Sequence, residues 1–324
     1  MATVARVAGV ARSTVSKALR DDSTIPAQRR DEIKQLAVKL GYRPNPLIST
    51  LMAQLHGNRR RNDPHHIAWL DLWKNSSELQ IMMPLYTGAC ERAAELGYNI
   101  EVYRPIADGI SPDRLRQVLN ARSQWALIIP PVPESQMRYP LDLSGLAGAT
   151  VGTSLHEPIM HRVSPNHFQG AQLACAKLRA KGFRRIGLAL SPELNYRVEG
   201  KWLGAFVAEQ QFWPSSHRVP PLLVANGDQG AFKRWLDETR PDVILLAEPQ
   251  IDGWVKSSSK SAKSRVPVTW LHLESNLKGV WHIDYHAARI GAAAVELVIG
   301  QIHRNERGSP AIPHVLMLDS SWQE

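Results

Sequence analysis

The residues with the most distinctive chemistry lie near the N-terminus, where basic and hydroxyl side chains recur along one short segment, "VAGVARSTVSKALRDD". A helix from about residue 12 to residue 20 would place Val15, Ala18 and Leu19 on its inner face. Its outer face would then carry Arg12, Ser13, Ser16, Lys17 and Arg20. Hydroxyl groups can bond phosphates, and Arg or Lys can reach guanine edges in a DNA major groove. The segment therefore predicts a surface able to enter such a groove.

Two further helices are predicted to hold this segment in place. An apolar side of Val4, Ala5, Val7 and Ala8 precedes it, and Gly9 permits the positive φ of a tight turn. A third helix is predicted to begin near Pro26, a residue tolerated in a first turn. Its inner stripe would consist of Ile33, Leu36, Ala37 and Leu40, and Gly41 would end it. Three short helices of this kind predict a helix-turn-helix unit.

The distribution of charge supports the same interpretation. The net charge of the 324-residue chain is +9. Residues 1–62 hold twelve Lys and Arg against four Asp and Glu, whereas the remaining residues hold 27 against 26. Only the N-terminal segment is therefore expected to meet a polyanion. A solvated basic tail is the alternative, but this segment is patterned and is not a simple Lys/Arg run.

At this point a family resemblance becomes specific. "VARVAGVARSTVSKAL", followed by "LGYRPNPLISTL", resembles the N-terminal module of LacI-type transcription regulators. The resemblance implies that Arg12, Ser13 and Lys17 read bases and that Thr14 and Ser16 hold phosphates. It also implies a hinge helix from Asn45 to about Gln54 that enters the minor groove as a pair, with Leu51 as the wedge. An apolar wedge of this kind unstacks a base step and kinks the duplex.

Four positions depart from the family pattern, and the first is Thr3, where the family has an acidic residue. Ala11 stands where the family has a Ser, so the second helix lacks a preferred N-cap, which is worth about 0.5–2 kcal/mol. In the hinge, Ile48 and Ser49 replace the usual Ala and Arg. These changes affect hinge packing and phosphate contacts but leave the wedge in place.

The rest of the chain predicts parallel α/β sheets. Short apolar runs such as "WALIIPP", "RRIGLAL" and "DVILLAE" alternate with helical patterns such as "FQGAQLACAKLRAKG" and "AARIGAAAVELVIGQIHRN". This alternation is typical of βαβ units, and the length suits two lobes. We therefore expect a helix-turn-helix head at 1–44, a hinge and linker at 45–64, and a two-lobed domain at 65–324. The resemblance implies that this domain is periplasmic-binding-protein-like, binds an effector and forms a dimer.

Ligands of parallel sheets bind beyond the carboxyl ends of the strands. Polar or aromatic candidates directly after predicted strands, or at the family's contact position, are Asp71, Trp73, Arg197, Glu248 and Glu274. A Trp face can stack on a sugar ring, and these groups together suit a polyol or sugar. A nucleobase or an acid remains an open alternative. Each residue also has a structural interpretation, as core for Trp73 and as a helix cap for the others.

A metal site is the main enzymatic alternative. "HIDYH" places His282, Asp284 and His286 at alternate positions, and imidazole with carboxylate suits zinc or iron. Residues two apart on a strand lie about 6.5 Å apart, too far to chelate together comfortably. The chain also contains no P-loop, GxSxG or HExxH motif. We therefore expect no enzyme activity, no cofactor and no bound metal.

Taken together, these patterns predict a regulator, with repression as the default. It would bind a pseudo-palindromic site in double-stranded DNA as a homodimer, and a small molecule, a sugar or sugar derivative, would control it. A sequence-neutral architectural DNA-binding protein is the alternative, although it would not need the large two-lobed domain. Cys90 and Cys175 have no zinc spacing, and no apolar run could span a bilayer. These features, with no visible signal peptide, favour a cytoplasmic protein without membrane contact.

Overall fold

The computed structural model describes residues 2–19, 24–40, 65–75, 79–122, 124–258, 265–272 and 279–324. The chain divides into two compact units, Met1–Asp63 and Pro64–Glu324. The predicted boundary between head and hinge at residues 44 and 45 lies outside the described residues and stays a prediction. None of the described helices is long and apolar enough to cross a membrane.

The first unit contains the three predicted helices, α1 (Ala2–Ala8), α2 (Arg12–Leu19) and α3 (Ala27–Lys39). Gly9 joins the first two with φ of 63°, a left-handed conformation that favours glycine. Val15 and Ala18 are completely buried and pack with Ile33 and Ala37. The predicted inner faces of α2 and α3 thus meet in one small core.

One expected core residue of the head is placed differently. Leu40 was predicted to belong to the inner stripe, but it is 42% exposed. The reason is that α3 ends at Lys39, so Leu40 lies in the turn that follows, with its N–H bonded to the Leu36 carbonyl. Leu36 itself is half-buried against the core.

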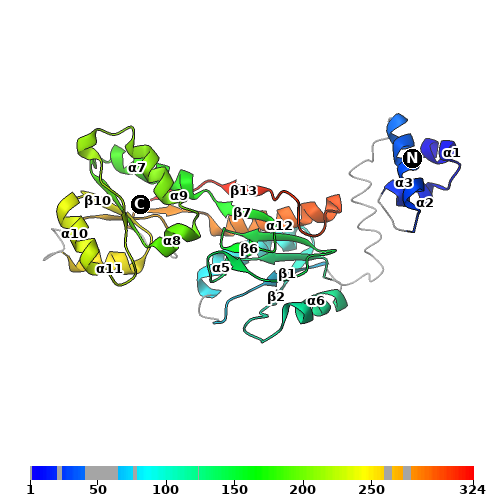
Figure 1. The fold of residues 1–324 in the computed structure, drawn as a ribbon, viewed down its shortest axis with the longest axis horizontal. Coiled ribbons are helices and arrows are strands. Elements are labelled where there is room, and N and C mark those ends of the chain that lie inside the picture. The colour runs from blue at the N-terminus through cyan, green and yellow to red at the C-terminus, as the bar shows by residue number, and fades with distance from the viewer. Residues whose placement is uncertain are drawn as a thin grey trace. The chain divides into compact units, whose positions relative to one another are not determined.

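The second unit consists of two lobes, shown in Figure 1. The first lobe is formed by residues 65–165 and 287–318, and the second by residues 167–284 and 321–324. The first lobe contains β1 (His65–Leu70), α5 (Leu79–Glu95), β2 (Tyr98–Tyr103), α6 (Pro112–Ala121), β3 (Ala126–Ile129), β4 (Met137–Arg138), β5 (Ala147–Val151), β6 (Leu155–Glu157), β7 (His161–Pro165), α12 (Ala287–Arg304) and β13 (Val315–Leu318). Its main sheet has the order β13-β7-β5-β3-β1-β2, and all its pairs are parallel.

The second lobe has the same plan. Its elements are α7 (His167–Ala180), β8 (Ile186–Leu190), α8 (Pro192–Arg197), α9 (Lys201–Gln210), the 3-10 helix η2 (Ser215–His217), β9 (Leu222–Leu223), α10 (Gln229–Thr239), β10 (Val243–Leu246), α11 (Pro249–Ser257), β11 (Val268–Trp270), β12 (His282–Asp284) and β14 (Ser321–Gln323). The sheet order is β14-β12-β11-β10-β8-β9, and only β14 is antiparallel to its neighbour. The prediction of an all-α head with a two-lobed parallel α/β unit is confirmed.

Both main sheets are covered by helices on two faces, and their central strands β3, β5, β8 and β10 are buried at every position. In β1, Ile67 and Trp69 belong to the core under α5 and α12, whereas Ala68 and Leu70 face the core under α6. The second lobe repeats this with α7 and α9 on one face and α10 and α11 on the other. Continuous apolar runs are typical of parallel strands covered on both sides.

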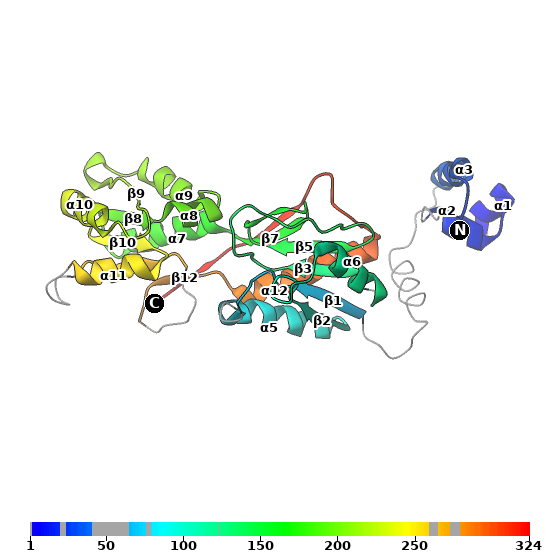
Figure 2. The same cartoon turned by 60° about the horizontal axis from the view of Figure 1, so that its bottom comes forward.

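The chain passes between the lobes three times, at Asn166, at Tyr285–His286 and at Asp319–Ser320 (Figures 1 and 2). Hydrogen bonds join the first passage to the third. The Asn166 Nδ2 group donates to Asp319 Oδ1 at 2.8 Å, and the Ser320 N–H donates to Gln169 Oε1 at 3.0 Å. These bonds hold the first and third passages together, and we call the three passages the hinge region.

The helix pair α5 and α12 packs closely through glycines. A Cβ at Gly88 would lie 2.1 Å from the Ala288 carbonyl oxygen, and a Cβ at Gly291 would lie 2.0 Å from that of Leu85. Backbone contacts this close leave no room for a side chain. Pro84 lies inside α5, five residues after Leu79. Because proline has no N–H, one i→i−4 bond near the start of the helix is not made.

We predict that Gly291→Ala destabilises the protein by about 1–3 kcal/mol or more, because the methyl group collides with backbone atoms of α5. Urea unfolding of the full chain measures the change. Gly253→Ala is the matched control, since a Cβ there meets no heavy atom within 4 Å. Removing a helical glycine in open space should stabilise the protein by about 0.5–1 kcal/mol. Equal effects of both substitutions would contradict the predicted close packing.

Candidate functional site

The first candidate surface is the outer face of α2. Ser13 and Lys17 are exposed and Thr14 is half-buried. The Lys17 Nζ group lies 3.5 Å from Thr24 Oγ1, so the ammonium remains at the surface. Arg12 and Ser16 belong to the same helix. The other predicted DNA-binding residues, Arg20, Asn45 and Leu51, lie outside the described residues.

The second candidate site is built around residues 130–134 of the first lobe, which follow β3. This segment reads "PPVPE", and we call residues 130–133 the proline loop. Proline has no N–H, so Val132 supplies the loop's single backbone donor. That donor is used, because the Val132 N–H bonds Ser154 Oγ at 3.0 Å. The loop therefore offers carbonyl acceptors to its surroundings and attracts donors.

Trp73 supplies one of these donors from the end of β1. Its Nε1–H donates to the Pro131 carbonyl at 2.7 Å, and its ring is half-buried. Asp71 holds Trp73 in place by accepting the Trp73 N–H at 3.0 Å. The Asp71 carboxylate also lies 3.5 Å from Arg104 Nε. Burial raises the pKa of Asp71, against the lowering effects of these two partners.

Arg197, at the end of α8, supplies the other donors and does so across the lobes. Its Nη2 donates to the Val132 carbonyl at 2.6 Å, and its Nη1 donates to the Pro133 carbonyl at 3.0 Å. In the opposite direction, the Thr153 hydroxyl of the first lobe donates to the Arg197 carbonyl at 2.6 Å. Burial lowers the pKa of the guanidinium, which still remains protonated. Arg197 thus connects the lobes through both its side chain and its backbone.

Glu248 supports α8 rather than the proline loop. It occupies the N-cap position of α11 but makes no side-chain cap bond there. Instead, its Oε2 accepts the N–H of Ser191 at 2.7 Å, and Ser191 caps α8 through its own hydroxyl. Glu248 therefore anchors the start of the helix that ends in Arg197. Glu274 lies outside the described residues.

A cavity of about 310 Å³ adjoins the proline loop. Its lining includes Trp73, Pro133, Met137 and Ile106, with the charged residues Lys74 and Glu134. Pro133 joins the cavity to the cross-lobe contact, since its carbonyl accepts from Arg197. The volume lies at the lower end of the range for small-molecule pockets, about 300–1,000 Å³. The apolar and aromatic lining suits the face of a small ring.

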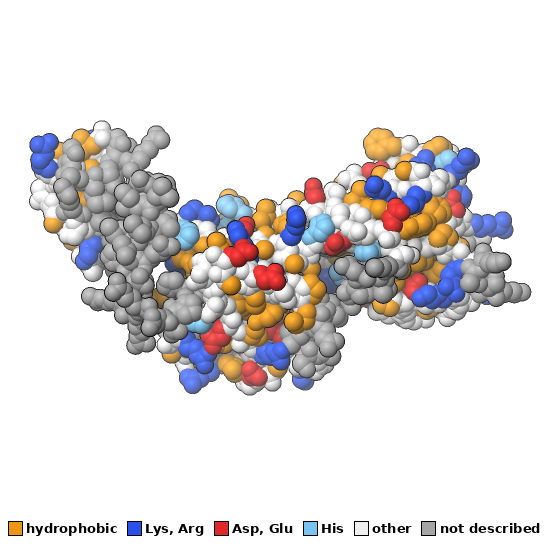
Figure 3. Space-filling model, turned by 180° about the vertical axis from the view of Figure 1, so that it is seen from behind, with side chains coloured by type: hydrophobic (Ala, Val, Ile, Leu, Met, Phe, Trp, Pro, Cys, Tyr) orange, Lys and Arg blue, Asp and Glu red, His pale blue; other side chains and the backbone are white. Residues whose placement is uncertain are grey.

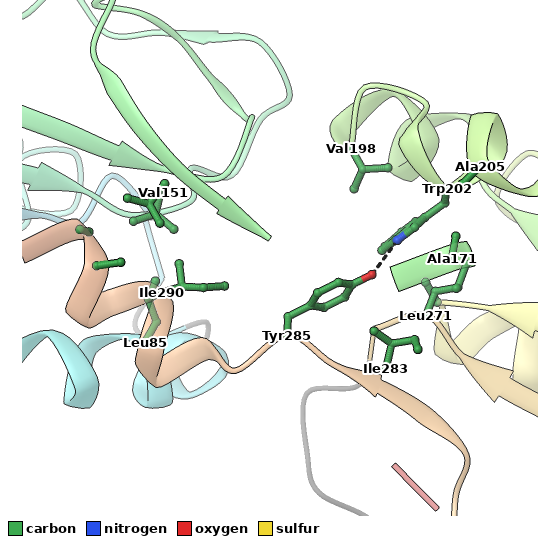
Figure 4. Packing of buried hydrophobic residues seen from close by; sticks show 14 of the residues in the cluster. Leu85, Val151, Ala171, Val198, Trp202, Ala205, Leu271, Ile283, Tyr285 and Ile290 are labelled. Carbon is green, nitrogen blue, oxygen red and sulfur yellow. Dashed lines mark hydrogen bonds between the residues drawn. The ribbon is translucent and has the colours of Figure 1, made fainter. Parts of the chain in front are cut away.

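An aromatic cluster lies at the second passage between the lobes. Tyr285 accepts a hydrogen bond from Trp202 Nε1 at 2.8 Å, as the dashed line in Figure 4 shows. The His167 ring packs edge-on against both aromatic rings, with centroids 4.9 Å from each. Its Nδ1 is buried without a hydrogen-bond partner. Burial, with smaller contributions from His272 and Lys201, lowers the pKa of His167 to about 3.

The "HIDYH" residues do not share one strand face. The strand β12 ends at Asp284, and His286 lies beyond it with φ of 55°. Asp284 accepts the His286 N–H at 2.7 Å, and its other oxygen lies 3.1 Å from His286 Nδ1. His282 is turned to the Val280 carbonyl. In the described part of the chain, no group of three or more His, Cys, Asp or Glu residues is placed to hold a metal ion.

The sequence analysis missed the acceptors of this site. Trp73 and Arg197 were candidates, but Val132, Pro133 and Thr153 were not. The proline-rich run was visible, yet it was assigned to the end of a strand. It carried one usable signal, because a segment with a single backbone N–H must satisfy its carbonyls with side-chain donors or water. The structure brings Asp71, Trp73 and Arg197 together around this loop.

We predict that His167→Gln flattens the loss of stability in acid. In the wild type, the unfolded chain binds a proton at this imidazole below pH about 6.5, whereas folded His167 binds one only near pH 3. Stability must therefore fall as the pH drops through this window. Urea midpoints between pH 7.5 and pH 4 measure the slope. His303→Gln, at an exposed position on α12, should leave the slope unchanged. An unchanged slope in His167→Gln would contradict the prediction.

Comparison with known proteins gives similarities for both units. No curated protein matches the chain. Residues 1–45 match the family model described as "Bacterial regulatory proteins, lacI family".

Solved structures match over the larger unit as well. The "transcriptional regulator CelR-cellobiose complex" is 17% identical, with 99% of this chain and 97% of that chain covered and a TM-score of 0.55. A lac repressor bound to ONPG is 18% identical, with 99% and 97% covered and a TM-score of 0.56. A LacI transcriptional regulator from Lactobacillus brevis is 14% identical, with 80% and 100% covered and a TM-score of 0.55. At these identities the similarity establishes the fold.

The sequence comparison of the head and the structural comparison of the larger unit therefore agree. The head carries the family's sequence pattern, and the larger unit has the two-lobed fold of the family's solved members. The similarity to the lacI family of bacterial regulatory proteins thus covers residues 1–45 in sequence and the larger unit in fold.

Proposed function

We propose that the protein is a transcription regulator that binds a specific DNA sequence as a homodimer and responds to a small molecule of the sugar class. The observation that carries this proposal is the junction of a lacI-family head with a two-lobed unit whose lobes meet at a polar, aromatic site. Repression is the expected outcome of binding.

The head supports the DNA-binding part of the proposal. Residues 1–62 carry the basic excess of the chain, and the exposed Ser13 and Lys17 lie on α2, the second helix of the helix-turn-helix. In such units the second helix enters the major groove and its side chains contact base edges. Charged side chains of both signs are interspersed on the face of the larger unit in Figure 3. The positive field that attracts DNA therefore belongs to the head.

The larger unit supports the effector part. A sequence-neutral architectural protein would need the head alone, whereas this chain adds two lobes that meet at Arg197 and the proline loop. A small molecule at this contact would change the relative stability of lobe arrangements. Because coupling between two sites is reciprocal, DNA binding must change the affinity for the small molecule by the same factor. Among the solved relatives, one holds cellobiose and another ONPG.

The decisive experiment is selection of bound fragments from a random DNA pool by the full-length protein near physiological salt. An enriched pseudo-palindrome is expected, because two heads of a symmetric dimer would read two half-sites. Binding without any enriched sequence would contradict the proposal and favour the architectural alternative. The selected site then serves to screen sugars for release.

We predict that Lys17→Ala reduces discrimination between the selected site and single-base variants of it by about 1–3 kcal/mol, through loss of a base contact. Fluorescence anisotropy with labelled duplexes measures both affinities. Lys39→Ala is the matched control, since it removes the same charge from α3. It should weaken binding to all duplexes by similar factors. Equal behaviour of the two variants would remove Lys17 from the base-reading surface.

We predict that Leu51→Ala lowers affinity for the selected site and leaves small-molecule binding unchanged. The physical reason is the loss of an apolar wedge. Such a wedge partly unstacks a base step and bends the DNA, and the cost of unstacking is offset because the bent DNA contacts more protein surface. Circular-permutation gel shifts measure the bend directly. A variant that bends and binds the site like the wild type would show that Leu51 is not the wedge.

A further inference from the structure

One ion pair joins the two lobes of the larger unit. Among the ion pairs in the described parts of the lobes, only that of Arg162 with Glu199 has its two members in different lobes. Arg162 belongs to β7 of the first lobe, and Glu199 lies between α8 and α9 of the second. The Arg162 Nη1 group lies 3.5 Å from Glu199 Oε1. This pair therefore connects the corner between α8 and α9 to the first lobe.

Arg162 is held in position by its own lobe. Its Nη2 group donates to the Leu155 carbonyl at 3.1 Å, and its backbone N–H donates to the His314 carbonyl at 2.9 Å. Its side chain is only 21% exposed, so the guanidinium is partly shielded from solvent. Partly buried ion pairs are screened less by salt than fully exposed ones. The first lobe thus presents a fixed cation to the second lobe.

The backbone at Glu199 has a conformation that favours glycine. Helix α8 ends in a Schellman motif, in which the Glu199 N–H donates to the Tyr196 carbonyl at 2.9 Å. The Gly200 N–H completes the motif by donating to the Asn195 carbonyl at 2.8 Å. Glu199 has a φ of 56°, which is left-handed, and glycine is the usual residue there because a Cβ raises the energy of this conformation. The local backbone therefore does not account for a glutamate at this position.

The carboxylate of Glu199 does account for it. One oxygen, Oε1, faces Arg162 across the lobes, and the other, Oε2, accepts a hydrogen bond from Lys201 Nζ at 2.6 Å. Lys201 belongs to the same lobe as Glu199, so it orients the carboxylate toward the first lobe. An unfavourable backbone conformation at a residue other than glycine points to a functional constraint on that residue. The constraint here is the contact with Arg162.

The contact lies away from the points where the lobes are joined. Arg162 comes four residues before the first passage, at Asn166. Because a strand rises about 3.3 Å per residue, the two positions are about 13 Å apart. Rotation of one lobe about the passages therefore changes the distance between Arg162 and Glu199. The ion pair can form only in a lobe arrangement close to the one described.

We infer that Glu199 controls the equilibrium between lobe arrangements, because its ion pair with Arg162 stabilises the described arrangement against rotation. The pair acts without a bound small molecule, so its effect is a property of the protein alone. The inference rests on the proposed function only in its consequence for DNA. If the lobe arrangement sets the affinity of the head for DNA, the charge of Glu199 changes that affinity as well.

The test measures a distance between the lobes in the full-length protein. Spin labels are attached at Gln117→Cys on α6 and Lys233→Cys on α10, in a Cys90→Ser background that removes the more accessible native thiol. Labelled chains are mixed with an excess of unlabelled chains, so that distances within one protomer dominate. Double electron–electron resonance then gives the populations of the lobe arrangements.

Glu199→Gln removes the charge and keeps the length of the side chain. It should shift the population away from the described arrangement by about 1.5- to fivefold, the range measured for partly exposed ion pairs. Arg162→Gln should reproduce this shift, and the double variant should shift no further, because both substitutions remove the same interaction. Glu296→Gln is the matched control, since it breaks an ion pair with Arg92 that lies within the first lobe and should leave the populations unchanged.

Glu199→Gly separates a role in lobe arrangement from a role in stability. It should shift the lobe populations as Glu199→Gln does. It should nevertheless unfold at an equal or higher urea concentration than the wild type, because glycine adopts the left-handed backbone without a Cβ penalty. A residue that served only to stabilise the fold would give a lower urea midpoint when it is replaced by glycine.

Two results would overturn the inference. One is an unchanged distance distribution in Glu199→Gln, and the other is additive shifts of the two substitutions in the double variant. Measurements with DNA separate this inference from the proposed function. A shift of the lobes in Glu199→Gln with unchanged affinity for the selected DNA site would refute the regulatory coupling and leave the inference standing. Selection of no DNA site at all would refute the proposed function, and the distance measurement would still decide the role of Glu199.

Discussion

The close meeting of the three inter-lobe passages at Gly170 is the constraint on which the larger unit depends. A Cβ at this position would lie 2.9 Å from the Tyr285 hydroxyl oxygen and 3.1 Å from Ser320 Oγ. Gly170 belongs to α7, which follows the first passage, while Tyr285 and Ser320 belong to the second and third. Only a residue without a side chain lets these segments approach so closely. The side chains of Tyr285 and Ser320 therefore pack directly against the backbone of α7 at Gly170.

This convergence determines where the candidate site forms. It fixes the two lobes so that the carboxyl ends of β1 and β3 in the first lobe meet the end of α8 in the second. The hydrophobic cluster in Figure 4 continues through the hinge, with Leu85 and Val151 on one side and Val198 and Ala205 on the other. Contacts across the site, in contrast, are polar. Apolar packing at the hinge thus coexists with hydrogen bonds across the candidate site.

Local patterns predicted the fold class well because strands such as β8 and β10 are apolar throughout and the helices have clear periodicity. They did not predict β13 and β14. These strands are short and partly exposed, and each joins a different sheet, which no local pattern specifies. The candidate site was predicted in part. Trp73 and Arg197 were recognisable as side chains, but their acceptors are backbone carbonyls, whose availability depends on tertiary structure.

The brevity of the passages limits how the lobes can move. Each consists of one or two residues between elements that belong to different sheets. A chain segment spans at most about 3.3–3.6 Å per residue, so the longer passages reach only about 10 Å between their anchored ends. Sliding one lobe past the other would exceed this tether, and separation along the axis joining them would do the same. The motion that remains is rotation of one lobe relative to the other about the three passages. The parts of each lobe that lie farthest from the passages would then move most.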